Sequence, residues 1–190
     1  MYPICFCSVL ALGVFLERLF KLRRTRVLPQ DLIQTLNDLI MRYKYTDAIM
    51  LCQGHPSPIA RIYHAALKIS GQPRQVIKEV VQEVGRREAA ELEKYLSVLS
   101  TIASITPLLG LLGTVSGMIK TFNIIAYYGV GNPGTMAGGI SEALITTAAG
   151  LTVAIPTLVG YRFVSSKADN LILNLEEQSI KLVESLKGPE

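Results

Sequence analysis

Three long apolar stretches dominate the pattern of hydrophobic and polar positions, at residues 2–16, 96–128 and 136–164. A helix needs about 20 apolar residues to cross the hydrocarbon core of a bilayer. The first stretch is shorter than this, which leaves open whether the native chain extends upstream of Met1. The pattern predicts an all-α integral membrane protein with three transmembrane helices.

Apolar residues recur at helical spacing between the first two stretches as well. One predicted helix presents Leu32, Leu36, Leu39 and Ile40 on a single face, and a second presents Ile59, Ile62, Tyr63 and Ala66. Proline and glycine break the pattern at 54–58 and at 71–73, because neither residue continues a helix easily. These segments are expected to form a helical bundle outside the bilayer.

The second and third apolar stretches each join a longer helical pattern. No helix breaker lies between Pro73 and Pro107, so a continuous helix is predicted from Gln75 to Tyr128. The third pattern runs on through Ser165 to Leu186. The apolar stripe of the helix that begins at Gln75 consists of Val76, Val80, Val84, Leu92, Tyr95, Leu96 and Leu99.

The resulting organisation has three spans, two of which extend as long helices into the bundle. Its predicted parts are a first transmembrane helix at 1–20, a helical region at 21–95, a second transmembrane helix at 96–128, a turn at 129–135, a third transmembrane helix at 136–164 and a C-terminal helix at 165–190. No strand pattern and no internal repeat is convincing.

Composition agrees with a membrane location, and the distribution of charge predicts the orientation. The 190-residue chain is 49% hydrophobic and 18% charged, below the roughly 25% charged content of soluble domains. Residues 1–16 contain no lysine or arginine, and a basic collar follows directly, consisting of Arg18, Lys21, Arg23, Arg24 and Arg26. The positive-inside rule then places the N-terminus and residues 128–135 outside, and places residues 17–95 and the C-terminus in the cytoplasm. Anionic lipid head groups are the expected partners of the collar.

Several other functional classes find little support. A cleaved signal peptide would carry its basic residues before the apolar stretch, not after it. Cys5, Cys7 and Cys52 show no metal or redox spacing, and neither His55 nor His64 has ligand spacing. The sequence contains no nucleotide-binding glycine loop and no catalytic triad pattern. We therefore expect no enzyme activity, no metal, no cofactor and no nucleic-acid partner.

Glu142 is the residue that most needs an explanation. It is the only acidic residue in the 67-residue stretch from Tyr95 to Tyr161, where Lys120 is the only other full charge. A carboxylate in hydrocarbon costs at least roughly 2.5–3.5 kcal/mol, so such residues usually serve proton relays, ion paths or partner contacts. Thr146 lies one turn from Glu142 on the same face, and Thr147 lies in the next quadrant. Together these residues predict a polar path.

Small residues and prolines accompany this polar path in the second and third spans. Small residues allow helices to approach closely in a membrane. Proline removes one backbone hydrogen bond, so a kink is expected at each proline. The predicted packing residues are Gly110, Gly113, Gly117, Ala149 and Gly150, and the predicted kinks are at Pro107 and Pro156.

Two plainer interpretations remain open at this point. Glu142 lies about seven residues past Thr135, so it could reach water at the outer end of its helix. Lys120 could likewise extend to the interface, because its long apolar stem reaches several ångströms, or it could form a salt bridge.

Two motifs resemble the signatures of the ExbB/TolQ/MotA proton-channel family. Residues 106–119 read TPLLGLLGTVSGMI, like the second span of that family, and residues 140–156 read ISEALITTAAGLTVAIP, like its third span. Glu17-Arg18 at the end of the first span also fits. The presence of three spans is closer to ExbB and TolQ than to MotA, whereas Ser116 and Lys120 depart from common family residues.

This resemblance implies a function and a set of partners. Family members form homopentamers in the bacterial inner membrane, and the family's polar pore residues correspond to Thr114, Glu142 and Thr147. The pore holds two single-span ExbD- or TolR-like subunits, each with an essential Asp, and protons are the coupling ion. The work passes to a TonB- or TolA-like protein, for outer-membrane transport or integrity. Whether the role is that of ExbB or that of TolQ, and which process is energised, stays open.

Two other functions compete with a proton-driven motor subunit. In a non-conducting structural scaffold, Glu142 would only pair with a partner helix. A small secondary transporter is the third possibility, although the sequence lacks the inverted repeats and broken helices of that class.

Overall fold

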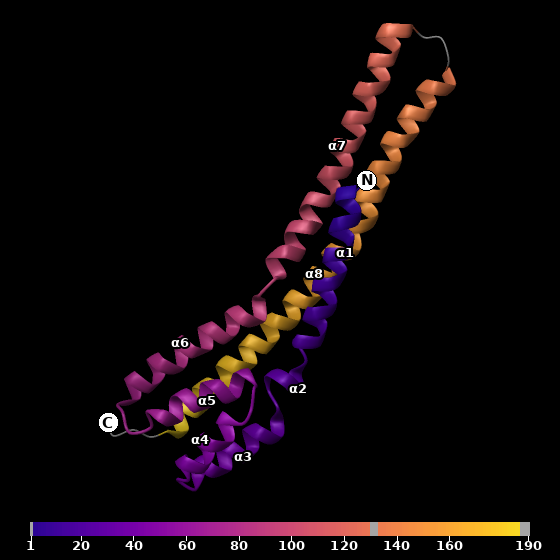
Figure 1. The fold of residues 1–190 in the computed structure, drawn as a ribbon. Coiled ribbons are helices and arrows are strands. Elements are labelled where there is room, and N and C mark those ends of the chain that lie inside the picture. Colours follow the sequence, from indigo (N-terminus) through magenta and orange to yellow (C-terminus); the bar gives the residue numbers. More distant parts are fainter. Residues whose placement is uncertain (1, 130–132, 187–190) are drawn as a thin grey trace. The chain divides into compact units, whose positions relative to one another are not determined.

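The computed structural model describes residues 2–129 and 133–186, and throughout these residues it contains helices and no strands. The helices are α1 (Tyr2–Lys21), α2 (Arg24–Val27), α3 (Gln30–Met41), α4 (Tyr45–Gln53), α5 (Pro58–Lys68), α6 (Arg74–Glu93), α7 (Leu96–Tyr128) and α8 (Pro133–Ser185), shown in Figure 1. Helices long and apolar enough to cross a membrane lie within Tyr2–Lys21, Arg74–Tyr127 and Met136–Ser185. The predicted fold class is thereby confirmed. The division of these helices into membrane and aqueous parts stays a prediction.

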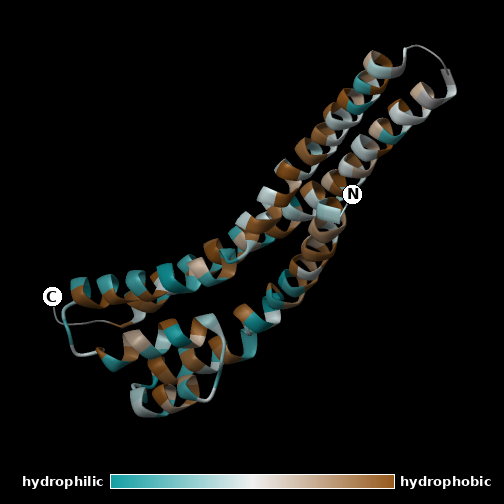
Figure 2. Ribbon diagram, turned by 45° about the horizontal axis from the view of Figure 1, so that its top comes forward, coloured by the Kyte–Doolittle hydropathy of each residue, from teal (hydrophilic) through white to brown (hydrophobic). Residues whose placement is uncertain are grey.

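The described residues form two compact units. The membrane unit consists of the chain up to Arg18 together with Tyr95–Val164, and the helical-bundle unit consists of Leu19–Lys94 together with α8 from Ser165 onward. Figure 2 shows that α7 is mostly brown and white around its circumference, whereas α6 alternates teal with brown. The first pattern suits a lipid environment and the second suits water.

In the membrane unit, α1 packs against the first turns of α7. Ala11 of α1 is buried with Leu99 and Ile102 of α7, and Phe15 and Tyr161 pack around this cluster. These contacts fix one face of the first predicted span to the second.

In the bundle unit, α5 supplies the central buried face. Ile59, Ile62, Tyr63 and Ala66 are all fully buried, as the helical spacing predicted. The capping of α5 is also clear, since the Ser57 side chain accepts a hydrogen bond from the backbone N–H of Ala60. The bundle core therefore follows directly from sequence periodicity.

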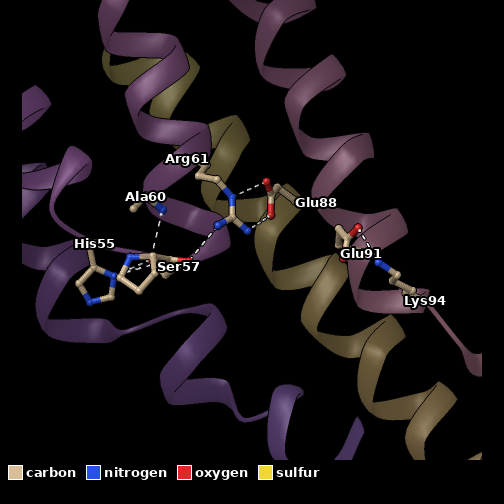
Figure 3. Close-up of polar contacts among 8 residues, drawn as sticks. His55, Ser57, Ala60, Arg61, Glu88, Glu91 and Lys94 are labelled. Carbon is tan, nitrogen blue, oxygen red and sulfur yellow. Dashed lines mark hydrogen bonds and ion pairs between the residues drawn. The ribbon is translucent and has the colours of Figure 1, made fainter. Parts of the chain in front are cut away.

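An ion pair between Arg61 of α5 and Glu88 of α6 joins these two helices (Figure 3). The Arg61 Nε donates to Glu88 Oε1 at 2.6 Å, and an adjacent guanidinium N–H donates to Glu88 Oε2 at 2.5 Å. The hydrogen bond to Glu88 raises the pKa of Arg61. A third guanidinium nitrogen donates to the Pro56 carbonyl oxygen at 2.9 Å. Bidentate pairs of this kind fix geometry as well as charge, and the sequence pattern did not reveal this one.

The predicted apolar stripe is wrong in the first part of α6, at Val76, Val80 and Val84, whereas Leu92, Leu96 and Leu99 are buried as predicted. The bundle buries Ile77, Val81 and Leu92, together with the Glu88 carboxylate. The predicted stripe began one residue earlier, at Val76, whose side chain is exposed. The alternative face is chosen because Glu88 must meet Arg61, a tertiary requirement that apolar periodicity does not encode.

The predicted continuous helix from Gln75 to Tyr128 is also interrupted. Lys94 is extended, with ψ of 138°, and Tyr95 is left-handed, with φ of 62°. A left-handed conformation costs a non-glycine residue roughly 1–2 kcal/mol. The Arg18 guanidinium lies 5.0 Å from the centroid of the Tyr95 ring, and a cation–π contact of this kind contributes a similar amount. By contrast, α8 continues without interruption to Ser185, as predicted.

Cys52 provides a pH-dependent test of the bundle core. Burial raises the pKa of its thiol to about 11, above the ordinary value of 9.0. Because the thiolate is the reactive form, alkylation at pH 8 should be roughly 100-fold slower than for an ordinary thiol, and its rate should rise as pH increases toward 11. Labelling by N-ethylmaleimide in a Cys5→Ser/Cys7→Ser background measures this rate. The control moves the thiol to the exposed end of α3, as Met41→Cys/Cys52→Ala, and equal rates at the two positions would contradict the buried placement.

Candidate functional site in the membrane unit

Glycines hold α7 and α8 in close antiparallel contact. A side-chain carbon placed at Gly113 would lie 2.3 Å from Thr146 Cγ2, and one at Gly117 would lie 2.8 Å from Ala143 Cβ. At Gly150 the same atom would lie 2.8 Å from the Thr106 carbonyl oxygen. None of these distances leaves room for a methyl group, so the absence of side chains sets the spacing of the two helices.

These contacts also define the register of the helix pair. Residue numbers on the two helices rise in opposite directions, so that Gly117 meets Ala143 while Gly110 meets both Thr147 and Gly150. Thr114, between Gly113 and Gly117, consequently lies at a level between Thr146 and Ala143. Glu142, five residues from Thr147, lies roughly 7.5 Å nearer to the end of the pair where α7 stops and α8 begins.

Thr147 connects the two helices by a hydrogen bond. Its hydroxyl donates to the Gly110 carbonyl oxygen at 3.0 Å, across 37 residues of sequence. The close approach at Gly110 makes this contact possible, since a bulkier residue there would separate the backbones. The hydroxyl oxygen of Thr147 keeps its capacity to accept a hydrogen bond from water or a partner.

The other two predicted threonines donate to the backbone of their own helices. The Thr146 hydroxyl donates to the Glu142 carbonyl oxygen at 2.9 Å, and the Thr114 hydroxyl donates to the Leu111 carbonyl oxygen at 2.7 Å. Thr146 is therefore a neighbour of Glu142 through the main chain and not through the carboxylate. Its methyl group faces Gly113 and belongs to the helix contact.

Glu142 projects from an exposed position of α8, next to the buried Ala143. Its carboxylate has no hydrogen bond or ion pair with any residue in the described ranges. Large apolar side chains, those of Leu144 and Ile145, are exposed beside it. A carboxylate on such a surface needs water or another polypeptide to solvate it.

Lys120 of α7 is exposed too, and within the described chain it forms no salt bridge. The register places it within about one turn of Glu142 along the helix pair, yet the two groups are not joined. The salt-bridge interpretation therefore receives no support within a single chain.

Pro107 lies inside α7 and Pro156 inside α8, and both helices continue through them. The Thr106 hydroxyl, just before Pro107, donates to the Ile102 carbonyl oxygen at 2.5 Å, and the Thr157 hydroxyl, just after Pro156, donates to the Val153 carbonyl oxygen at 2.7 Å. Each threonine therefore places a hydroxyl group next to the backbone hydrogen bond that the neighbouring proline cannot form. The kinks themselves stay predictions.

The structure adds residues that sequence reasoning overlooked. A side-chain carbon at Gly139 would lie 2.3 Å from Thr121 Oγ1, so this pair extends the close contact toward the α7–α8 connection. The sequence could have indicated this contact, because Gly139 and Ala143 are small residues four positions apart and therefore lie on one face of α8. Ala149 is half-buried but is not among the atoms nearest to the glycine positions.

Residues 55–177 match the model of the MotA/TolQ/ExbB proton channel family. The chain is 30% identical over 174 residues to a biopolymer transport protein ExbB homolog of Methanothermobacter thermautotrophicus, a match that covers 88% of this chain and 62% of that protein. It is 30% identical over 179 residues to the biopolymer transport protein exbB1 of Vibrio cholerae, and this match covers 92% of this chain and 78% of that protein. It is 35% identical over 127 residues to the Tol-Pal system protein TolQ of Pseudomonas aeruginosa, and this match covers 61% of this chain and 55% of that protein. The first and third of these relatives extend well beyond the part that this chain matches.

Proposed function

Because the chain belongs to the MotA/TolQ/ExbB proton channel family, we propose that it is the proton-channel or motor subunit of an inner-membrane complex driven by the proton motive force. The observation that carries the proposal is the Glu142 carboxylate, which stands without an intrachain partner on an otherwise apolar helix surface. The family is one of proton channels and not a class of enzymes, so the expected output is mechanical work. The coupling ion in this proposal is the proton.

Glu142 would accept and release protons, with Thr114 and Thr147 as polar neighbours. Hydroxyl groups both donate and accept, so they can pass a proton through water. The register supports this arrangement, because Glu142 lies roughly 7.5 Å from Thr147 along the helix axis and Thr114 lies at a level between them. Water or a partner group would bridge these side chains.

A relay along the pore needs at least one further exchange site. Within the described membrane unit Glu142 is the only carboxylate between Tyr95 and Tyr161, so the second site belongs to another polypeptide. We assign this site to a membrane Asp of an ExbD- or TolR-like single-span subunit, inside a homo-oligomeric, pentameric ring of this chain. The work then passes to a TonB- or TolA-like protein.

The proposed orientation has the N-terminus in the periplasm and the C-terminus in the cytoplasm. It rests on the basic collar that follows the first span, from Arg18 to Arg26, beside which anionic lipid head groups would lie. The helical bundle is then cytoplasmic, and Glu142 is in the periplasmic half of its span.

Purification of the tagged chain from native membranes tests the assembly. A single-span protein with a membrane aspartate should co-purify, and the native mass should correspond to a multimer of this chain. A stable monomer that retains no small membrane protein would contradict the proposed pore, because one α7–α8 pair cannot enclose a path.

A structural scaffold is the competing function, favoured by the absence of any second intramembrane carboxylate in this chain. In a scaffold, Glu142 would serve only as a charge partner. Exchanging it with a partner cation should then preserve function, and no proton flux should be measurable.

Thr147 separates packing from proton transfer. Thr147→Val removes the hydroxyl that donates to Gly110 but keeps the branched shape, whereas Thr147→Ser keeps the hydroxyl. Interhelical hydrogen bonds in membranes contribute about 0.6 kcal/mol on average, so the valine variant should still assemble. We expect gradient-dependent work to fall clearly in the valine variant and much less in the serine variant. Equal activity in both variants would reduce Thr147 to a packing residue.

A further inference from the structure

Lys120 is a charged residue of the membrane unit to which the proposed relay assigns no role. Between Tyr95 and Tyr161 it and Glu142 are the only full charges. Both side chains are exposed, and neither forms an ion pair with another part of the described chain. An ammonium group on an apolar helix surface needs an anion or water, just as a carboxylate needs a cation or water. The position of Lys120 relative to Glu142 therefore decides what it can bind.

The register of the helix pair places Lys120 and Glu142 at nearly the same height. In both views α7 and the first part of α8 lie side by side (Figures 1 and 2). Gly117 is level with Ala143, so Lys120, three residues further along α7, is level with Ile140 of the antiparallel α8. Since Ile140 is two residues from Glu142, the two charged residues differ in height by roughly 3 Å.

The two charged residues also project from the same side of the helix pair. Each directly precedes a residue of the helix contact, which is Thr121 in α7 and Ala143 in α8. One step back along an α-helix is a rotation of about 100°. Because the two helices run in opposite directions and face each other, equal rotations away from the contact lead to the same side. A cation and a carboxylate therefore share one side of the α7–α8 pair, which we call the charged flank.

Among the described residues of the membrane unit, the remaining charged side chains lie far from the charged flank. Glu17, Arg18 and Arg162 belong to the opposite end of the unit, where the Arg18 guanidinium lies 5.0 Å from the centroid of the Tyr95 ring. Tyr95 and Lys120 are 25 residues apart, which is roughly 37 Å along the helix. The anion that balances Lys120 is therefore Glu142 or a group of another polypeptide.

We propose that Lys120 holds the membrane carboxylate of the single-span partner beside Glu142, so that the three groups share one proton. This inference rests on the proposed function and specifies how its partner is bound. The ammonium stays charged, and the set is neutral when one of the two carboxylates carries the proton. The proton passes from one carboxyl oxygen to the other, directly or through water, and the ammonium balances whichever carboxylate is left ionised.

Charge balance is the physical reason for this assignment. Without Lys120, the site would have a net negative charge whenever one of its carboxylates gave up a proton, and a net charge in apolar surroundings is costly. With Lys120, transfer between the two carboxylates leaves the net charge at zero throughout. Lys120 is thus a positioning residue, and the proton is exchanged by Glu142 and the partner's carboxylate.

Zero-length cross-linking of the complex purified from native membranes tests this contact. Dicyclohexylcarbodiimide activates a protonated carboxyl group, the lysine amine then forms an amide with it, and the carbodiimide takes up the elements of water as a urea. We expect an adduct between this chain and the single-span protein, located at Lys120 by peptide mass spectrometry.

The matched control for cross-linking is Lys120→Arg. A guanidinium keeps the positive charge but is not deprotonated in proteins, so it forms no such amide. The adduct at this position should disappear while the single-span protein still co-purifies. Three results would each overturn the proposal: no adduct in the wild-type complex, an adduct that persists in Lys120→Arg, or a Lys120 amide to Glu142 alone.

Proton flux through the reconstituted complex gives the functional measurement. Lys120→Met removes the charge and keeps an unbranched apolar side chain, and we expect flux to fall about tenfold, less than the loss expected for a proton carrier itself. Lys120→Arg should retain more flux than Lys120→Met, and the native mass shows whether each variant assembles. Equal flux from the wild-type and Lys120→Met complexes would contradict a role for the ammonium.

Ser116 allows the cation to be moved to a neighbouring position. It directly precedes Gly117, a residue of the helix contact, and so lies on the charged flank one turn from Lys120. Ser116→Lys in the Lys120→Met background should therefore restore part of the flux. No recovery in an assembled complex would show that a cation on this flank is not what the site requires.

The wild-type complex separates this inference from the proposed function. If the single-span protein co-purifies and the wild-type complex conducts protons, but the Lys120 variants behave like the wild type, only the role of Lys120 is lost. If no single-span protein is retained, or if the wild-type complex conducts no protons, the proposed function fails and this inference fails with it.

Discussion

Replacing Glu142 with glutamine is expected to abolish gradient-dependent work in cells while the complex still assembles. Glutamine has nearly the same shape, but it does not exchange a proton, and Glu142 makes no intrachain contact that the substitution would break. Loss of a positioned proton-transfer group typically costs on the order of 100-fold or more in rate. Growth or transport that depends on the proton motive force gives the readout, and the native mass of the purified complex gives the assembly control.

Glu142→Asp is the matched variant, because it keeps the carboxylate and shortens the side chain by one methylene. We expect partial activity from it, above that of the glutamine variant. Full activity in Glu142→Gln would show that the residue neither carries nor controls protons. Equal loss in both variants would mean that the length of the side chain matters as much as its carboxylate.

Gly150→Ala is expected to separate α7 from α8. The added methyl group would lie 2.8 Å from the Thr106 carbonyl oxygen and 3.1 Å from Gly110 Cα, and both are backbone atoms that cannot rotate away. Overpacking of this kind costs about 1–3 kcal/mol. Unfolding of the purified protein in mixed detergent, followed by circular dichroism, should show the loss of stability.

Gly138→Ala is the control on the same helix. A methyl group at Gly138 would meet nothing within 4 Å, so this substitution should be neutral or slightly stabilising, as alanine is the better helix former. If both substitutions changed stability alike, the glycine contact between the helices would not be what holds them together.

The sequence predicted those parts of the fold in which local pattern and burial coincide. The apolar lengths predicted the three spanning helices, and the spacing of Ile59, Ile62 and Tyr63 predicted the buried face of α5. It failed on α6 because Glu88, a charged residue, takes part in the buried face through Arg61. A prediction of the buried face from apolar positions alone leaves out a buried carboxylate.

The interruption at Lys94–Tyr95 was missed for a related reason. Neither residue is a helix breaker, and the left-handed φ of Tyr95 is accompanied by a contact with Arg18, 77 positions earlier in the chain. Local helix propensity does not include contacts between residues so far apart in the sequence.

The candidate site was identified from composition, but its hydrogen bonds were not. One carboxylate in an uncharged stretch was enough to single out Glu142. The Thr147 bond to Gly110 depends on the register of two helices, and the register follows from contacts at Gly113 and Gly117 that spacing alone does not assign. Likewise, Thr146 proved to bond the Glu142 main chain and not its carboxylate.

The central claim is that Glu142 forms half of a proton site that a partner completes. Proton flux into liposomes, followed with a pH-sensitive dye under an imposed gradient, tests it most directly. Flux is predicted from the complex that contains the single-span partner, and none is predicted from this chain alone or from the complex carrying Glu142→Gln. Equal flux from the wild-type complex and the Glu142→Gln complex would contradict the account.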